Sequence, residues 1–370
     1  MKMGKPEPGT RKDRRTASEN NNVTRGGGWY NGPGRAGKET GVDLRATAER
    51  VLAIDEAKAL AQLEDYIRRG RDPARGPGVL LGLSGGLDSA LLASLAVRAL
   101  GRKSVHVVFL GERDTDPDTA RKSRLVAEGL GLEWETEDIS PEIRAKGHYS
   151  SVAMWVTARW GWVNRHVVCR LYRWATGETP FLSTLRRGDF TGRPITRLMY
   201  RSGMRQVEAA FNARQLHRRE VLERRAAERN ACVIGAANRS EGMTGWFVIG
   251  GADDMPFQPL MGLYKTQVRG LARRLEVPAE IIEQAPSPDM MRGVTDELAL
   301  GIAYEKLDLV LDGIERGKAD GELEALGIRP QEVRLVQEMN RMSAWKRNPA
   351  HVAPVDGGIN GGLRTNTQKQ

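Results

Sequence analysis

The sequence has few cysteines and histidines and no long apolar run. Its two cysteines, Cys169 and Cys232, do not form a Cys-x-x-Cys pair, and its five histidines show no metal-ligand spacing. No apolar run reaches the roughly 18 residues that a membrane-spanning helix needs. The N-terminus also lacks the apolar segment of a signal peptide. We therefore expect a soluble, cytoplasmic protein without a Cys/His metal site.

Composition and charge indicate that the chain can form a core and which classes of ligand it can bind. At 370 residues and 40% hydrophobic content, the chain can bury a sizeable core. The net charge of +10 suits anionic ligands such as ATP, dinucleotides or RNA, and charge alone does not choose among them. Residues 1–42 are basic and poor in aliphatic side chains, so we predict a flexible tail, with nucleic-acid binding as the less favoured interpretation. We assign residues 43–355 to one domain and 356–370 to a flexible C-terminal tail.

Hydrophobic periodicity predicts alternating strands and helices. Apolar residues at helical spacing predict a single helix over Asp43–Arg69. Downstream, we predict strands at 78–83, 105–110, 133–139 and 232–235, and helices at 88–100, 117–130 and 206–229. This alternation indicates an α/β fold with a doubly wound parallel sheet. Ligands of such sheets bind at the carboxyl ends of the strands.

Residues 146–205 interrupt this alternation. The segment is rich in arginine and contains Trp155, Trp160, Trp162 and Trp174. We interpret it as a helical insertion in which the tryptophans are packing anchors. A lid over the site and an RNA-binding surface are the alternatives, because arginine and tryptophan together also stack on bases.

The segment Ser-Gly-Gly-Leu-Asp-Ser, residues 84–89, is the strongest functional signal. It lies between a predicted buried strand and a predicted helix, where unpaired backbone N–H groups and the helix dipole form an anion site. Gly85 and Gly86 let phosphate oxygens approach the backbone, and Ser84 and Ser89 add hydroxyl donors. Asp88 can hold a magnesium ion beside the phosphates. The Gly-Lys-Thr/Ser ending of a Walker loop is missing.

The loop resembles the SGGxDS pyrophosphate loop of the ATP pyrophosphatase group, whose members split ATP into AMP and pyrophosphate. Further motifs follow downstream: ANRSE at 237–241, GGADD at 250–254, YKTQVR at 264–269, APSPD at 285–289, TDE at 295–297 and SAWKRNP at 343–349. In this order, and over residues 45–355 apart from the insertion, the chain resembles the ammonia-dependent NAD synthetase family. The ordered combination is far more specific than any single motif.

The resemblance implies a role for each matching residue. Asp88 and Glu241 match the family's metal-binding carboxylates, and Lys265 matches a lysine that contacts phosphate. Ser287 matches a hydroxyl residue of a loop that closes on ATP, and Asp253 an aspartate at the substrate and ammonia end of the site. The implied ATP-binding residues are Gly82, Ser84, Gly85, Gly86, Asp88, Ser89, Lys265 and Ser287. The implied substrate-binding residues are Arg214, Asn238, Asp253 and Lys346, and the implied catalytic residues are Asp88, Glu241, Lys265 and Asp253.

The implied reaction uses ATP and Mg²⁺ to amidate nicotinic acid adenine dinucleotide. The substrate carboxylate attacks the α-phosphorus, and ammonia then attacks the acyl-adenylate to give the amide and AMP. Residues 1–75 are too short and too polar for a glutaminase, so the nitrogen comes from free ammonia or a separate partner. The resemblance also implies a homodimer.

The match departs from the family's motifs at four positions. Ala236 replaces a threonine, Leu216 an arginine, Val294 a glutamine and Trp345 a histidine. Loss of a charged contact costs about 1.5–3 kcal/mol, enough to change substrate choice. We therefore keep open the same chemistry on another carboxylate. Less favoured alternatives are an RNA-modifying enzyme of the same superfamily and a non-catalytic scaffold.

Overall fold

The computed structural model describes residues 43–70, 76–150, 169–288, 290–291 and 293–347. Its sheet has four parallel strands in the order β3-β2-β1-β4. They are β1 (Gly78–Gly82), β2 (Val105–Gly111), β3 (Trp134–Asp138) and β4 (Ala231–Val233). The predicted α/β fold with a parallel sheet is confirmed, and each predicted strand lies within two residues of its observed bounds at either end.

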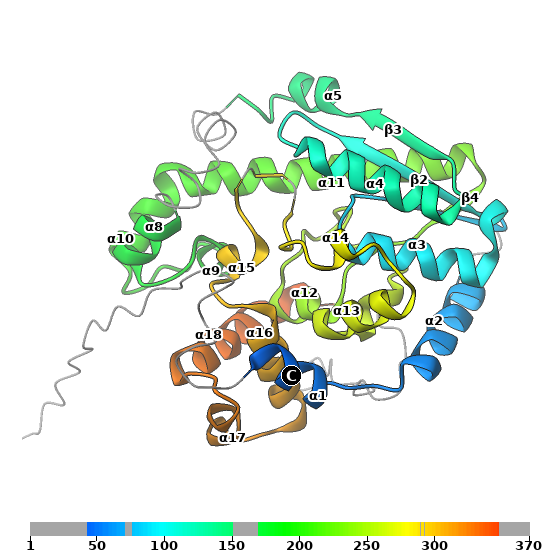
Figure 1. Cartoon of the computed structure of the whole chain (residues 1–370). Helices are drawn as coiled ribbons and strands as arrows, with labels where there is room; N and C mark the ends of the chain where they lie inside the picture. Colours follow the sequence, from blue (N-terminus) through cyan, green and yellow to red (C-terminus); the bar gives the residue numbers. More distant parts are fainter. Residues whose placement is uncertain (1–42, 71–75, 151–168, 289, 292, 348–370) are drawn as a thin grey trace, which may run out of the picture.

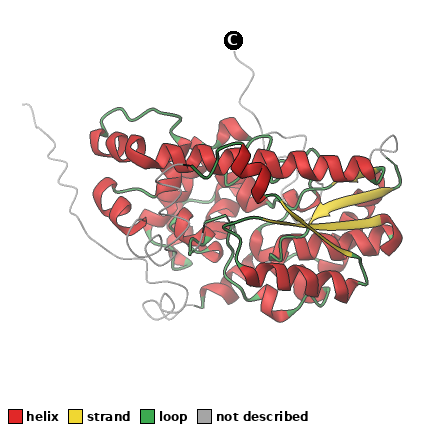
Figure 2. Ribbon diagram, turned by 90° about the horizontal axis from the view of Figure 1, so that it is seen from above, coloured by secondary structure: helices red, strands yellow, loops and turns green. Residues whose placement is uncertain are grey.

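Helices cover both faces of the sheet. In β1, Val79 and Leu81 belong to a core shared with α2 (Glu56–Gly70) and α3 (Leu87–Leu100), whereas Leu80 belongs to a core shared with α11 (Arg205–Glu228). Helix α4 (Pro117–Leu130) lies on the α3 side, and α5 (Ser140–Ala145) on the α11 side. This alternation produces the doubly wound arrangement, with the strands gathered toward one side of the molecule (Figure 2).

The strand order places a switch point between β1 and β4. From β1 the chain continues through α3 to β2 and then to β3, while β4 pairs with the other edge of β1. The connection that follows β1 therefore runs toward β2, on the opposite side of β1 from β4. The chain segments that follow β1 and β4 diverge at the carboxyl ends of these two strands. In open α/β sheets this divergence creates the crevice in which ligands bind.

The predicted single helix over 43–69 is wrong. The structure has α1 (Leu44–Val51) and α2, separated by a short connection. Asp55 accepts a hydrogen bond from the backbone N–H of Lys58 through Oδ1, at 3.0 Å, and so caps the start of α2. Aspartate caps a helix start well, and this cap begins a new helix although the apolar periodicity continues across it.

Apart from α13 (Lys265–Arg274) and α14 (Ala279–Ile282), which share the core of α2 and α3, the remaining helices form a second body beside the sheet (Figure 1). Its core joins α1 to α9, α16 and α18, and α11 extends from the sheet toward α8 and α10. The helices are α8 (Cys169–Thr176), α9 (Pro180–Leu185), α10 (Pro194–Met199), α12 (Arg239–Thr244), α15 (Asp296–Leu300), α16 (Tyr304–Arg316), α17 (Asp320–Ala325) and α18 (Pro330–Met342). Short 3₁₀ turns are η3 (Arg102–Ser104), η6 (Pro259–Gly262) and η7 (Ala344–Lys346), and η5 (Tyr200–Met204) is a π-helical turn.

Part of the predicted insertion lies within the described residues. From Cys169 to Met204 the chain is helical apart from its connections, whereas Trp155, Trp160 and Trp162 lie outside the described residues, as do both predicted tails. Within the described ranges, every helix is too short or too polar to cross a bilayer.

Candidate active site

The phosphate loop connects β1 to α3. Gly86 is the N-cap residue of α3 and contributes no side chain to the cap. The Oγ of Ser89 accepts from the backbone N–H of Ser84 at 3.2 Å and lies 3.1 Å from the Oγ of Ser84. Gly85 has φ +76°, and a Cβ there would lie 2.4 Å from the carbonyl oxygen of Thr119. Glycine is therefore required for both its backbone conformation and its close approach to α4.

A second helix begins at the carboxyl end of β4. Asn238 is the N-cap residue of α12: its Oδ1 accepts from the N–H of Glu241 at 3.1 Å, and Glu241 accepts from the N–H of Asn238 at 3.3 Å. This reciprocal capping box orients the Glu241 carboxylate toward the helix start. The amide Nδ2 of Asn238 also donates to Asp88 at 3.0 Å, which ties the two strand ends together.

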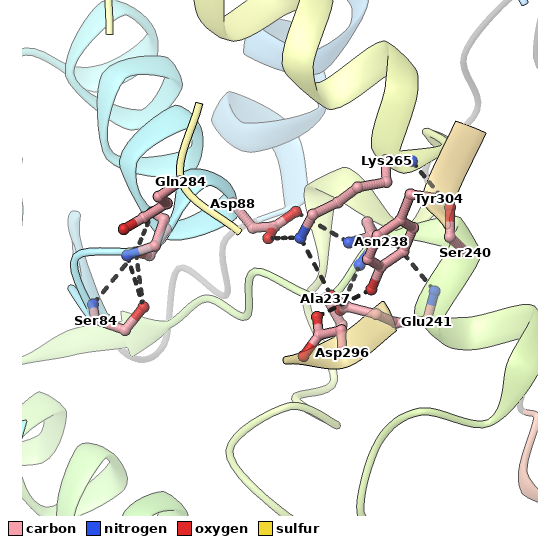
Figure 3. A network of polar contacts seen from close by, with 12 residues as sticks. Ser84, Asp88, Ala237, Asn238, Ser240, Glu241, Lys265, Gln284, Asp296 and Tyr304 are labelled. Atoms are coloured by element: carbon pink, nitrogen blue, oxygen red, sulfur yellow. Dashed lines mark hydrogen bonds and ion pairs between the residues drawn. The ribbon is translucent and has the colours of Figure 1, made fainter. Parts of the chain in front are cut away.

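Lys265 joins the two carboxylates. Its Nζ pairs with Asp88 and lies 3.6 Å from Glu241, and its side chain is 3% exposed (Figure 3). Burial raises the pKa of Glu241 to about 8, with the charge of Lys265 opposing that shift. Burial opposes the charge on Lys265, but Asp88 and Glu241 outweigh it and raise the pKa of this ammonium. The three side chains form one compact charge cluster.

Two further residues complete the cluster. Asp296 is buried, its pKa is raised by burial, and it accepts from the hydroxyl of Tyr304 at 3.0 Å. The Tyr304 ring lies 5.3 Å from the Lys265 ammonium. Asp296 was not among the residues predicted for the site, although its position in the TDE motif is a usable signal.

Asp88, Glu241, Lys265 and Asp296 line a cavity of about 440 Å³ at the switch point. Its lining includes the following predicted residues: Gly82, Ser84, Gly85, Gly86, Asp88, Ser89, Glu241, Asp253, Lys265 and Ser287. Within it, the Oγ of Ser287 donates to the carbonyl of Val294 at 3.1 Å. Residues far apart in the sequence thus meet around one space large enough for a nucleotide's phosphates and ribose.

A second cavity of about 500 Å³ adjoins the first. The two share Gln215, Trp246, Asp253 and Pro288. The second cavity is lined mainly by apolar and aromatic side chains, and three of the four departures lie on it: Leu216, Val294 and Trp345. The fourth, Ala236, lines the first cavity.

Asp253 lines both cavities, and Lys346 lies in the lining of the second. Asp253 accepts from the N–H of Val248 at 3.1 Å, and burial raises its pKa to about 6. Lys346 lines the second cavity and donates to the carbonyl of Gly245 at 2.7 Å and to that of Phe247. Burial lowers the pKa of Lys346 to about 8, against the pull of Asp253 and other carboxylates.

Arg214, predicted to bind substrate, lies in neither cavity. Its side chain is 0% exposed and grips Glu112 through two nitrogens, at 2.9 and 2.6 Å. Arg218 also donates to Glu112, at 3.0 Å, and lines the first cavity. Burial would raise the pKa of Glu112, but Arg218 and Arg214 hold it at about 2. Glu112 and Arg218 were missed by sequence reasoning; the signal is that Glu112 directly follows β2.

The two carboxylates fit a magnesium ion. Mg²⁺ in nucleotide sites is held by one or two carboxylates together with substrate phosphates. Asp88 and Glu241 converge on the Lys265 ammonium from two strand ends, so both point to one place. Among the described residues, no group of three or more His, Cys, Asp or Glu side chains is arranged to hold a metal. The donor set therefore suits an ion that arrives with phosphate oxygens.

Comparison with known proteins identifies the family of the chain. A family model described as NAD synthase matches residues 59–177 and 195–350. The NH(3)-dependent NAD(+) synthetase of Rhizobium meliloti is 33% identical over 279 residues, covering 74% of this chain and 83% of its own. That of Thermotoga neapolitana is 34% identical over 272 residues, covering 73% and 87%.

Two solved structures share the fold. NMN synthetase from Francisella tularensis superposes with a TM-score of 0.54 at 23% identity, covering 84% of this chain and 98% of its own. The NH3-dependent NAD synthetase from Campylobacter jejuni gives 0.54 at 22% identity, covering 79% and 96%. With the family model matching most of the sequence, the chain belongs to the NAD synthase family.

Proposed function

We propose that this chain amidates nicotinic acid adenine dinucleotide to NAD, with ATP as co-substrate and ammonia as the nitrogen donor. The observation that carries the proposal is the cluster of Asp88, Glu241 and Lys265 beside the phosphate loop, adjoining a second cavity for the acid. The relatives named above, NH(3)-dependent NAD(+) synthetases, support the same activity.

The reaction proceeds in two displacements. A carboxylate oxygen of the acid attacks the α-phosphorus of ATP, the bond to the β-phosphate oxygen breaks, and pyrophosphate leaves. Ammonia then attacks the acyl carbon, AMP leaves, and the nitrogen loses one proton. No side-chain nucleophile is needed, so positioning and charge stabilisation provide the catalysis.

The cluster supplies these two effects. Backbone N–H groups at the start of α3, with Ser84 and Ser89, would bind the departing pyrophosphate. Lys265 would place its buried positive charge against the phosphates. Asp88 and Glu241 would hold Mg²⁺, which when bound neutralises phosphate charge during the displacement.

The acid would bind across the junction of the cavities. Asp253 accepts a hydrogen bond from the N–H of Val248, and Lys346 donates one to the carbonyl of Phe247. Held in this way, the two charged groups would lie on either side of the acyl carbon that reacts with ATP. Arg214 and Asn238 would act differently from the prediction that they bind substrate. Arg214 holds Glu112, and Asn238 holds Asp88, so both are positioning residues.

A second candidate is the same chemistry on another carboxylate. Leu216, Val294 and Trp345 all line the second cavity, and each is apolar where the family motif has a polar side chain. An apolar lining favours an acid with fewer charges than a dinucleotide, because unpaired phosphates are costly to bury.

We also propose a homodimer. Four large apolar side chains on α8 and α10 are strongly exposed: Leu171 at 51%, Trp174 at 70%, Ile195 at 56% and Leu198 at 69%. Contiguous exposed apolar side chains are typical of association surfaces. Light scattering should give twice the chain mass, and Trp174→Glu with Leu198→Glu should give the monomer.

The activity is tested by incubating the protein with ATP, Mg²⁺, ammonium and nicotinic acid adenine dinucleotide, with mass spectrometry for NAD and AMP. We expect equal amounts of both, lost on Asp88→Asn and retained on Asp320→Asn, a change of an exposed residue on α17. ATP binding without NAD, but with amide from a smaller acid, would favour the second candidate. Absence of pyrophosphate release with every acid would refute both.

A further inference from the structure

Lys122 on α4 is a third cation in the lining of the first cavity, which would bind the nucleotide. The described lining contains three cationic side chains, Lys122, Arg218 and Lys265. The charge of Lys265 is neutralised by ion pairs with Asp88 and Glu241, and that of Arg218 by an ion pair with the buried Glu112. Lys122 instead pairs with Asp118, at 2.7 Å, a carboxylate that is 47% exposed. Its charge is the least neutralised of the three, since exposed pairs contribute little.

The packing of α4 brings Lys122 to the phosphate loop. The carbonyl of Thr119 lies so close to Gly85 that a Cβ would not fit between them. The hydroxyl of Ser123 donates to the carbonyl of Leu83 at 2.6 Å. Lys122 is the residue before Ser123 and lies three positions after Thr119, on the helix face that lines the cavity. This turn of α4 is therefore held against the loop by the Ser123 hydroxyl and by the close approach of the Thr119 carbonyl to Gly85.

Gln284 links the Lys122 ammonium to the same loop. The Nζ of Lys122 donates to Oε1 of Gln284 at 2.9 Å, and Nε2 of Gln284 donates to the carbonyl of Gly85 at 2.8 Å. Gln284 lies beside Ser84, on the other side of Asp88 from Lys265 (Figure 3). An ammonium donates three hydrogen bonds, and these contacts with Asp118 and Gln284 account for two.

We propose that Lys122 binds the β- and γ-phosphates of ATP and that Gln284 positions it for this contact. On binding, the Lys122 ammonium exchanges its solvent-exposed partner Asp118 for phosphate oxygens while Gln284 holds it against the loop. Lys122 and Lys265 then flank the triphosphate from both sides. The inference rests on the proposed use of ATP, and not on the identity of the acid.

Nucleotide binding without acid or ammonia tests the proposal directly. We would measure ATP and AMP dissociation constants by calorimetry for the wild type and for Lys122→Met, which keeps length and removes charge. We expect ATP binding to weaken by about tenfold or more, the worth of one charge-assisted hydrogen bond. AMP lacks the terminal phosphates, so its binding should change less than about twofold. Arg124→Met, which removes a 62% exposed charge from the same helix, should change neither.

Three more variants separate phosphate binding from a structural role. Lys122→Arg should keep ATP affinity within a few-fold, because it keeps the charge. Asp118→Asn removes the competing carboxylate and should leave ATP binding equal or tighter. Gln284→Leu should weaken ATP binding less than Lys122→Met, and should add nothing in the double variant, because both act through one contact.

The outcomes also separate this inference from the proposed activity. An unchanged ratio of ATP to AMP affinity in Lys122→Met, with NAD still formed by the wild type, overturns the role of Lys122 alone. A lowered ratio in a protein that makes no NAD supports Lys122 while refuting the activity. Equal weakening of ATP and AMP would mean that Lys122 only supports the loop, which also overturns the proposal.

Discussion

Asn238 donates a hydrogen bond of 3.0 Å to Asp88, across 150 residues of sequence. The same side chain caps α12 through its oxygen. One amide therefore fixes both the start of a helix and the orientation of a proposed metal ligand. The carboxyl ends of β1 and β4 are joined by this contact at the point where the strand order diverges.

The two roles of Asn238 can be separated. Asn238→Ser keeps a capping oxygen but loses the contact with Asp88, whereas Asn238→Ala loses both. We expect both variants to lower the amidation rate by about tenfold, the worth of a hydrogen bond to a charged group. Only the alanine variant should lose a further ~1 kcal/mol of unfolding free energy. Steady-state rates and urea unfolding measure the two effects; equal stability of the variants would contradict the capping role.

Gly85→Ala should abolish ATP binding in a folded protein. The added Cβ meets the Thr119 carbonyl, so the loop and α4 must separate. Gly101→Ala is a matched control, because Gly101 has φ +80° and its Cβ would meet nothing within 4 Å. The control should cost about 1 kcal/mol of stability and leave ATP affinity unchanged. Calorimetry with ATP and thermal unfolding compare the two; ATP binding retained by Gly85→Ala would show that the loop adapts.

Glu112→Gln should be among the most destabilising single changes. It leaves the fully buried Arg214 guanidinium with Asp114, at 3.4 Å, as its remaining carboxylate partner, and removal of one partner of a buried pair costs about 3–5 kcal/mol. Glu128→Gln, which breaks the exposed pair with Arg124, should cost less than about 1 kcal/mol. Urea unfolding of both variants provides the comparison. Similar costs would mean that Arg214 finds another partner.

The pKa of Lys346, lowered by burial to about 8, predicts a pH dependence. If its ammonium binds the acid, the KM for the acid should rise as pH increases through 8, while the KM for ATP stays level. Between pH 8 and the ordinary lysine pKa of about 10.5, the unfolded chain holds a proton that the folded chain has released. This group therefore makes stability rise with pH over that range. In Lys346→Met, neither the KM for the acid nor this part of the stability should depend on pH in this range. A wild-type KM for the acid that does not change across pH 8 would show that the Lys346 ammonium does not bind the acid.

Sequence patterns predicted those structural elements that are formed by consecutive residues. The run from β1 through Ser84–Ser89 to α3 was predictable because a buried strand, glycines and a helix follow one another without interruption. The break between α1 and α2 was missed because the apolar spacing continues across Asp55. The start of the second helix is marked only by the side-chain cap that Asp55 provides. Periodicity reports burial, whereas the exact ends of a helix depend on such caps.

Long-range pairing was beyond the reach of the sequence. The resemblance implied that Arg214 binds substrate, yet its side chain is buried and pairs with Glu112, 102 residues away in the sequence. Lys122 and Gln284 carry no motif and meet because α4 packs on Gly85. The sequence by itself determined the strand–loop–helix unit, the parallel sheet and the chemistry of the acidic and basic motifs, since these depend on neighbouring residues. Only the tertiary structure decided which charges face the cavity and which neutralise one another in the core, because burial and pairing depend on segments that folding alone brings together.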